Sequence, residues 1–127
     1  MILSCLYVNG SSQRGRGVFT SEDIVTGTII EISPVIVMGS ADRVLLDQTL
    51  LHDYIFEWGE THKECCMALG YIALYNHAYR SNCEYEMDYE ASAIRIRTVR
   101  HIWGGEELFI NYNGDWDNNK PVWFKTT

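Results

Sequence analysis

The sequence contains no long apolar run. None of its segments approaches the ~20 consecutive apolar residues of a membrane-spanning helix, and residues 1–8 lack the basic start of a signal peptide. We therefore expect neither a membrane partner nor secretion by a classical signal. The length of 127 residues fits one domain with one hydrophobic core, so we predict a single domain over residues 1–127.

Basic residues are also scarce. The chain has 10 Lys and Arg against 17 Asp and Glu, which gives a net charge of −7. Nucleic acids are bound through clusters of Lys and Arg, so we expect no direct nucleic-acid partner. An acidic surface attracts a basic protein or peptide instead, although the same charge can serve solubility alone.

The cysteines do not form a metal-binding motif. Cys5, Cys65, Cys66 and Cys83 include no Cys-x-x-Cys pair, and the histidines show no regular ligand spacing. We therefore predict no metal site. A thiol enzyme that pairs Cys66 or Cys83 with a histidine is an alternative, but no recognisable nucleophile motif supports it.

The pattern that is present has mainly a period of two residues. Residues 94–99 alternate cleanly, and residues 84–89 place tyrosine and methionine on one face and acidic residues on the other. The two segments predict a hairpin whose turn lies at residues 90–92.

Further strands are expected on both sides of this hairpin in the sequence. Residues 28–32 and 35–38 predict two strands separated by Pro34, because proline cannot donate a ladder hydrogen bond. Residues 108–112 predict a last strand after a glycine pair that breaks the chain.

Helices are expected to be few. The best candidates are residues 42–51 and residues 65–74, and both are short. Many short strands with two short helices predict a mainly β fold of several small sheets.

Three stretches carry residues suited to binding or chemistry. Residues 15–17 (GRG) can expose backbone amides to a ligand because glycine adopts positive φ, but they fit an ordinary hairpin turn equally well. Asn76 can donate and accept hydrogen bonds, whereas a lone histidine such as His77 is more often a core imidazole. Residues 105–112 (GEELFINY) end in Tyr112, which also fits a buried strand tyrosine.

In order and spacing, these stretches resemble the signature motifs of SET-domain protein lysine methyltransferases. The resemblance covers residues 15–112 and includes the family's Asn-His-(four residues)-Asn pattern, which Asn82 completes. Ala78 and Ser81 depart from the Ser and Pro that the family often has at these positions. The length is closest to the compact viral and bacterial members.

The resemblance implies a SET-domain, β-clip-like fold of several small sheets. Its C-terminal strand would thread the Asn-His segment in a pseudoknot, which periodicity could not reveal. The implied core covers residues 14–113, and residues 114–127 form a short tail. This tail lacks the zinc-binding cysteine cluster that follows many SET domains.

The resemblance also implies a protein-lysine N-methyltransferase that uses S-adenosylmethionine to methylate a lysine side chain, for example in a histone tail. Tyr112 would be catalytic, since methyl transfer mainly needs an aligned donor and a neutral amine. The implied cofactor-binding residues are Gly15, Arg16, Gly17, Tyr54, Asn76, His77, Tyr112 and Trp116. Trp123 and Phe124 are alternatives to Trp116 for covering the adenine.

A lysine channel would need aromatic walls. Tyr54, Phe56 and Trp58 share one face of a period-two segment, and Tyr75 precedes the Asn-His pair, although aromatic stripes are more often core. We predict a substrate channel lined by Tyr54, Phe56, Tyr75 and Ile110. In the family, a Phe or Tyr at the position of Ile110 often limits the room around the amine. A Tyr hydroxyl there holds a water that blocks further rotation of the amine, whereas a Phe does not. Ile110 therefore implies di- or trimethylation, unless a neighbouring tyrosine supplies the missing hydroxyl.

The expected partner is a basic protein or peptide. The resemblance to small family members also implies a homodimer. The protein would act in the cytoplasm or, if it acts on host histones, in the nucleus. The alternative is a catalytically inactive SET-fold module that binds a basic protein tail, but retention of Tyr112, Asn76 and His77 favours the enzyme.

Overall fold

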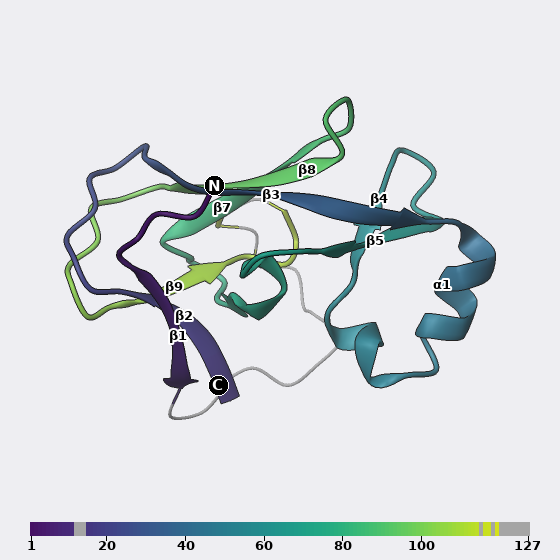
Figure 1. Ribbon diagram of the computed structural model, residues 1–127, viewed down its shortest axis with the longest axis horizontal. Coiled ribbons are helices and arrows are strands. Elements are labelled where there is room, and N and C mark those ends of the chain that lie inside the picture. The colour runs from purple at the N-terminus through teal and green to yellow at the C-terminus, as the bar shows by residue number, and fades with distance from the viewer. Residues whose placement is uncertain (12–14, 115, 118, 120–127) are drawn as a thin grey trace.

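The computed structural model describes residues 1–11, 15–114, 116–117 and 119. Its strands form two sheets (Figure 1). The first has the order β1-β2-β9-β6, with β1 Leu6–Ser11, β2 Gly15–Thr20, β9 Glu107–Ile110 and β6 Asn76–His77. The second has the order β4-β5-β3-β8-β7, with β4 Phe56–Trp58, β5 Glu64–Ala68, β3 Ile29–Met38, β8 Ala93–Thr98 and β7 Cys83–Asp88. The predicted mainly β fold of several small sheets is confirmed.

The predicted hairpin is present in the second sheet. Strands β7 and β8 pair antiparallel, and Asp88 faces Ala93 at the closed end. The Asp88 carboxylate accepts a hydrogen bond from the Ala91 N–H at 2.9 Å, which fixes the turn. The clean alternation of the sequence arises because each strand has one face toward the core.

The predicted interruption at Pro34 is wrong, because β3 runs through this residue. Pro34 is the last residue of β3 that pairs with β8, opposite Ala93, and Val35 is the first that pairs with β5, opposite Ala68. The strand changes partner at Pro34, so the missing N–H falls where one ladder ends and the next begins.

The helices are shorter than predicted. The predicted helix at residues 42–51 is replaced by α1 Ser40–Leu46 and the 3-10 turn η1 Leu50–Asp53. The predicted helix at residues 65–74 is wrong: this segment contains β5 and the 3-10 turn η2 Ile72–Leu74.

Burial explains the second error. Cys65 and Cys66 point to opposite faces of β5, yet both are buried, because Cys66 belongs to the core cluster and Cys65 lies against α1. This strand therefore shows no alternation of exposed and buried positions. Gly70 then turns the chain at a φ of +65°. No helix in the described part of the chain is long and apolar enough to cross a membrane.

One hydrophobic core joins the two sheets. Val18 and Leu108 from the first sheet belong to the same buried cluster as Ile30 and Ile94 from the second. Each fully buried aliphatic side chain contributes roughly 1.5–3 kcal/mol relative to an exposed one. Helix α1 lies at the end of the molecule away from β1 and β2, and none of its residues is buried (Figure 1).

The C-terminal strand interlocks with the Asn-His segment. Strand β9 pairs in parallel with β6, so that Asn76 faces Phe109 and His77 faces Ile110. The Asn82 amide nitrogen donates to the Glu107 carbonyl oxygen at 2.9 Å, and its oxygen accepts from the Phe109 N–H at 2.7 Å. This arrangement corresponds to the pseudoknot that the family resemblance implies, and it brings Tyr112 next to the Asn-His segment.

Candidate active site

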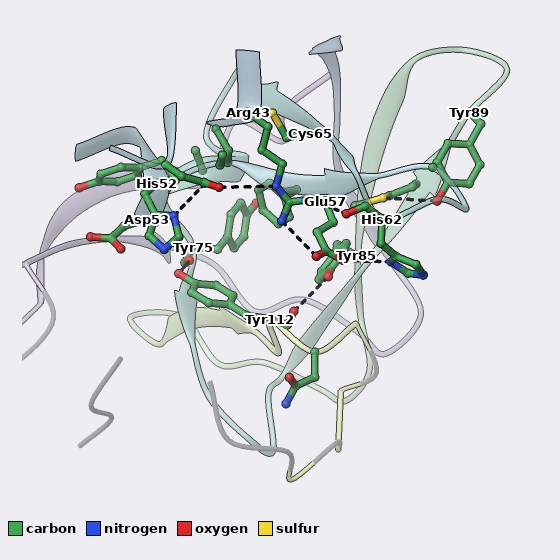
Figure 2. Close-up of a pocket in the computed structure, with 18 residues that line it drawn as sticks. Arg43, His52, Asp53, Glu57, His62, Cys65, Tyr75, Tyr85, Tyr89 and Tyr112 are labelled. Carbon is green, nitrogen blue, oxygen red and sulfur yellow. Dashed lines mark hydrogen bonds and ion pairs between the residues drawn. The ribbon is translucent and has the colours of Figure 1, made fainter. Parts of the chain in front are cut away.

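Two cavities meet at Tyr112. The first has a volume of about 380 Å³ (Figure 2), and the second has a volume of about 340 Å³. Among the described residues, four line both cavities: Asp53, Tyr54, Ala73 and Tyr112. Both volumes lie in the range of small-molecule sites, so two ligands could approach each other at this shared wall.

The glycine loop and Asn76 line the second cavity. Gly15, with a φ of +71°, and Arg16 form one side. The Asn76 side-chain nitrogen donates to the Arg16 carbonyl oxygen at 3.1 Å and to the Glu107 carboxylate at 2.8 Å. Asn76 therefore ties the loop to β9 and fixes the shape of this cavity.

Gly17 is required by packing. A Cβ at this position would lie 2.8 Å from the Asn76 side-chain nitrogen and closer still to the Glu107 carboxylate. The absence of a side chain at Gly17 allows Asn76 and Glu107 to pack against the glycine loop. Gly17 lines neither cavity.

The first cavity has aromatic walls and also carries charged groups, one of which, Asp53, lies on the wall shared with Tyr112. The Phe56 and Tyr85 rings pack edge to face, with centroids 5.3 Å apart. Glu57, which also lines this cavity, accepts from Arg43 at 3.1 Å and contacts the His62 ring nitrogen at 3.0 Å (Figure 2). The cavity thus offers an apolar slot that leads to a polar rim.

Tyr112 is held by its backbone and by its hydroxyl. Its N–H donates to His77 Nδ1 at 3.0 Å, and its hydroxyl donates to the Tyr75 carbonyl oxygen at 2.7 Å. Burial, together with nearby Tyr54 and Asp53, raises the pKa of the Tyr112 hydroxyl. The hydroxyl therefore stays neutral at physiological pH and acts as a hydrogen-bonding group rather than as a base.

The structure brings most of the predicted site residues together. Those that line a cavity are Gly15, Arg16, Tyr54, Phe56, Tyr75, Asn76 and Tyr112. Trp58 is buried in the core and lines neither cavity.

Besides Gly17, three predicted residues lie outside both linings. The buried His77 ring accepts from Tyr112 and packs on the rings of Tyr79 and Tyr112. Ile110 is 0% exposed and belongs to the core cluster. The Trp116 carbonyl oxygen accepts from the Ser81 N–H at 3.0 Å.

The predicted roles of Gly17 and of these three residues therefore need contacts that the cavity linings do not contain. Trp123 and Phe124 lie outside the described residues.

Sequence reasoning did not assign a site role to several lining residues. Asp53 and Ala73 carry no motif, and each reaches the shared wall because it lies in a 3-10 turn, Asp53 in η1 and Ala73 in η2. Tyr85 did carry a signal, since the alternation of residues 84–89 placed it on an apolar strand face. That face now proves to line the first cavity rather than only the core.

The polar groups of the second cavity match an amino-acid-bearing cofactor. Arg16 can pair with a carboxylate and Asp53 with an ammonium group. The exposed backbone at Gly15 allows close approach of a ligand. Among the described residues, no three His, Cys, Asp or Glu side chains gather as a metal site.

Known proteins show the same architecture. A family model described as SET domain matches residues 15–113. The chain is 33% identical over 126 residues to a Schizosaccharomyces pombe histone-lysine N-methyltransferase, H3 lysine-37 specific, covering 98% of this chain and 80% of that protein. It also resembles the crystal structure of a candidate histone methyltransferase from Plasmodium falciparum, with a TM-score of 0.65, 27% identity, and coverage of 91% of this chain and 98% of that chain.

A more distant likeness supports the fold. A chain of Polycomb Repressive Complex 2 from Chaetomium thermophilum, in an autoinhibited conformation bound to S-adenosylmethionine, matches with a TM-score of 0.73 at 21% identity. The match covers 90% of this chain and 16% of that one.

The fold and the family match define the class: the chain belongs to the SET-domain family. Its Schizosaccharomyces pombe relative is a histone-lysine N-methyltransferase, and the prediction of a protein-lysine N-methyltransferase is confirmed.

Proposed function

We propose that this protein transfers methyl groups from S-adenosylmethionine to the ε-amine of lysine in a basic protein, and that histone H3 is the first substrate to test. The observation that carries the proposal is the wall that the two cavities share at Tyr112. A cofactor on one side and a lysine on the other would meet there. In-line methyl transfer requires that alignment of donor and acceptor.

The second cavity would hold the cofactor. Arg16 would pair with the carboxylate of its amino-acid part, and Asp53 would pair with its ammonium group. Asn76 would act by holding the glycine loop in place. When bound, S-adenosylmethionine supplies an electrophilic methyl group attached to a sulfonium.

The first cavity would hold the lysine side chain. The rings of Phe56 and Tyr85 offer faces for its aliphatic stem and its ammonium group. Lysine in water has a pKa of about 10.4, so the amine is mostly charged and unreactive near neutral pH. Burial in the apolar slot lowers that pKa and favours the neutral nucleophile.

The Tyr112 hydroxyl would orient the amine. Its hydrogen is donated to the Tyr75 carbonyl oxygen, and a phenolic oxygen can accept a hydrogen bond while it donates another. The neutral phenolic oxygen would then accept a hydrogen bond from the amine and orient it at the shared wall. No general base on the protein is needed, because burial favours loss of the lysine proton to solvent before the methyl group is transferred.

Two observations support a basic protein as substrate. The Schizosaccharomyces pombe relative is described as specific for lysine 37 of histone H3. The net charge of −7 favours the approach of a Lys- and Arg-rich tail over that of an acidic one.

Incubation with methyl-labelled S-adenosylmethionine and a panel of basic proteins tests the proposal. We expect label on histone H3 or on another basic protein, and none when the modified lysine is replaced by arginine. Cofactor binding without transfer to any protein would favour a binding module instead.

Calorimetry tests the cofactor site separately. Arg16→Gln should weaken S-adenosylmethionine binding. Arg97→Gln should not, because Arg97 pairs with Glu86 in the hairpin of β7 and β8 and lines neither cavity. Binding should survive chelator treatment. Equal affinity of the two variants would contradict the assignment of the second cavity.

A further inference from the structure

Glu31 is a carboxylate in the interior of the protein. It lies on β3, is 0% exposed, and has no ion pair with Lys or Arg in the part of the chain that the structure describes. A buried carboxylate is costly unless hydrogen bonds satisfy it. Three groups donate to it: the Ser33 hydroxyl at 2.7 Å, the Tyr71 N–H at 2.8 Å and the Tyr75 hydroxyl at 2.9 Å.

Two of these donors are the ends of one short segment, residues 71–75. Tyr71 precedes the 3-10 turn η2 and donates to Oε2, whereas Tyr75 follows the turn and donates to Oε1. The two oxygens of one side chain therefore hold both ends of the segment. Gly70 permits this approach, because a Cβ there would lie 3.1 Å from the Ser33 Cβ and closer still to the Glu31 carboxylate.

The same segment carries the carbonyl group that holds Tyr112. The Tyr75 side chain is 1% exposed and donates to Glu31, while its backbone oxygen accepts the Tyr112 hydroxyl at 2.7 Å. Tyr75 and Tyr112 line the same cavity (Figure 2). Because the ring and the carbonyl belong to one residue, a fixed ring restricts the direction of the carbonyl.

We propose that Glu31 is a positioning residue, whose carboxylate fixes segment 71–75 and thereby orients the Tyr75 carbonyl that holds the Tyr112 hydroxyl. The inference rests on the proposed methyl transfer at Tyr112. It adds a structural connection from the core to the site that no sequence motif contains.

Ser33 provides a matched control. Its hydroxyl donates to the same carboxylate as Tyr75, but Ser33 lies on β3 and outside segment 71–75. Ser33→Ala and Tyr75→Phe each remove one hydroxyl that donates to Glu31. A generic loss of stability would affect both variants, whereas loss of positioning would affect Tyr75→Phe alone.

Glu31→Gln tests whether hydrogen bonds to this side chain, rather than its charge, fix segment 71–75. Tyr71 N–H and the Ser33 hydroxyl both donate to Oε2, so a glutamine would place its oxygen there and its NH₂ group toward Tyr75. The Tyr75 hydroxyl can then accept instead of donating, and the contact persists. We therefore expect Glu31→Gln to recover most of the activity that Glu31→Ala loses.

Steady-state kinetics with a lysine peptide and S-adenosylmethionine measure the effect. Tyr75→Phe should lower kcat by about tenfold to a hundredfold while KM changes little, since small misplacements of catalytic groups have effects of this size. Ser33→Ala should leave kcat close to that of the unmodified protein. Equal losses in the two variants at equal melting temperature would overturn the proposal.

A double-mutant cycle tests whether the effect acts through Tyr112. In a Tyr112→Phe background, Tyr75→Phe should cause no further loss of kcat, because the hydroxyl that it positions is already absent. Independent, additive losses would overturn the proposal.

An NMR experiment tests the positioning of Tyr112 independently of enzyme activity. The NMR signal of the Tyr112 ring carbon that bears the hydroxyl, labelled with ¹³C, should shift in Tyr75→Phe and in Glu31→Ala but not in Ser33→Ala. An unshifted signal in Tyr75→Phe would show that Glu31 does not position Tyr112, even if methyl transfer is found. A shifted signal without methyl transfer would instead contradict the proposed function alone.

Discussion

His77 accepts a hydrogen bond from the backbone N–H of Tyr112 at 3.0 Å, and the centroids of their rings are 5.1 Å apart. The backbone N–H donates, so Nδ1 of His77 carries no proton in this arrangement. This contact fixes the backbone and the ring of Tyr112 without using its hydroxyl. The hydroxyl can therefore be removed while the position of the ring is retained.

Tyr112→Phe should keep the fold and most of the cofactor affinity but lower methyl transfer by roughly a hundredfold, because only the group that orients the amine is lost. Calorimetry and transfer of labelled methyl groups measure the two effects. Tyr89→Phe is the control, since Tyr89 lines the same cavity and its hydroxyl contacts Met87. Unaltered turnover of Tyr112→Phe would move the role to another tyrosine, such as Tyr54.

The product should be di- or trimethyllysine. Ile110 has no hydroxyl and is buried in the core, and the Tyr75 hydroxyl is bound to Glu31 at 2.9 Å. Tyr54 is therefore the candidate for restricting the methyl number, since it lines the shared wall. Mass spectrometry at long reaction times should show a larger trimethylated share in Tyr54→Phe and no change in Ile110→Val. A product that stops at one methyl group in the unmodified protein would contradict this prediction.

Two cysteine thiols should be inert in the folded protein. Burial, and then the neighbouring Cys65, raises the pKa of the Cys66 thiol to about 12, and burial also raises the pKa of Cys83. The thiolate is the reactive form, so a disulfide reagent should modify the half-buried Cys5 first. Cys5→Ser should abolish this fast phase, and unfolding should expose the remaining thiols. Rapid labelling of Cys66 or Cys83 in the folded state would argue against their burial.

Glu31 should make stability fall as pH rises. Burial raises the pKa of Glu31 despite the hydrogen bonds from Ser33 and Tyr71. Glu31 then keeps its proton to higher pH in the folded protein than in the unfolded chain. As pH rises from the pKa of Glu31 in the unfolded chain to its pKa in the folded protein, stability is therefore lost. Urea unfolding measures this effect over a range from about pH 4, near the usual Glu pKa, to about pH 8. Over this range the free energy of unfolding should fall in the unmodified protein relative to Glu31→Gln.

Glu106 provides a control, because its effect on stability should change with pH in the opposite direction. Burial alone would raise its pKa, but the Trp103 N–H and the Arg100 guanidinium lower it overall. The contribution of Glu106 is therefore present above its unfolded pKa and lost as pH falls through the folded pKa. The same pH trend for Glu31→Gln and Glu106→Gln, each relative to the unmodified protein, would contradict the assignment.

A homodimer is expected at tens of micromolar. Trp103 is 61% exposed, and Val44 and Leu45 project from α1, in which no residue is buried. Light scattering should give twice the chain mass. Comparison of Leu45→Glu with Trp103→Glu would show which surface forms the interface, and a monomer mass for the unmodified protein would remove the prediction.

The amino-acid order was sufficient to predict the β-rich architecture and much of the site. The hairpin of β7 and β8 could be predicted because one face of each strand packs in or against the core, which leaves a period of two in the sequence. Asn76 and Tyr112 could be predicted because they lie in motifs whose order and spacing identify a family.

Other features depended on the packing of distant segments. Cys65 and Cys66 are both buried, one on each face of β5, so this strand shows no period that distinguishes it from a helix. Pro34 is accommodated because β3 changes partner there, which depends on the register of two other strands.

The shared wall of the two cavities is also a tertiary feature. Asp53 and Ala73 reach Tyr112 from different parts of the chain, and the clamp formed by Glu31 on Tyr75 spans 44 positions in sequence. A local pattern reports only how one segment divides its side chains between core and solvent. Which segments then meet at Tyr112 is determined by the burial of both sheets against one core.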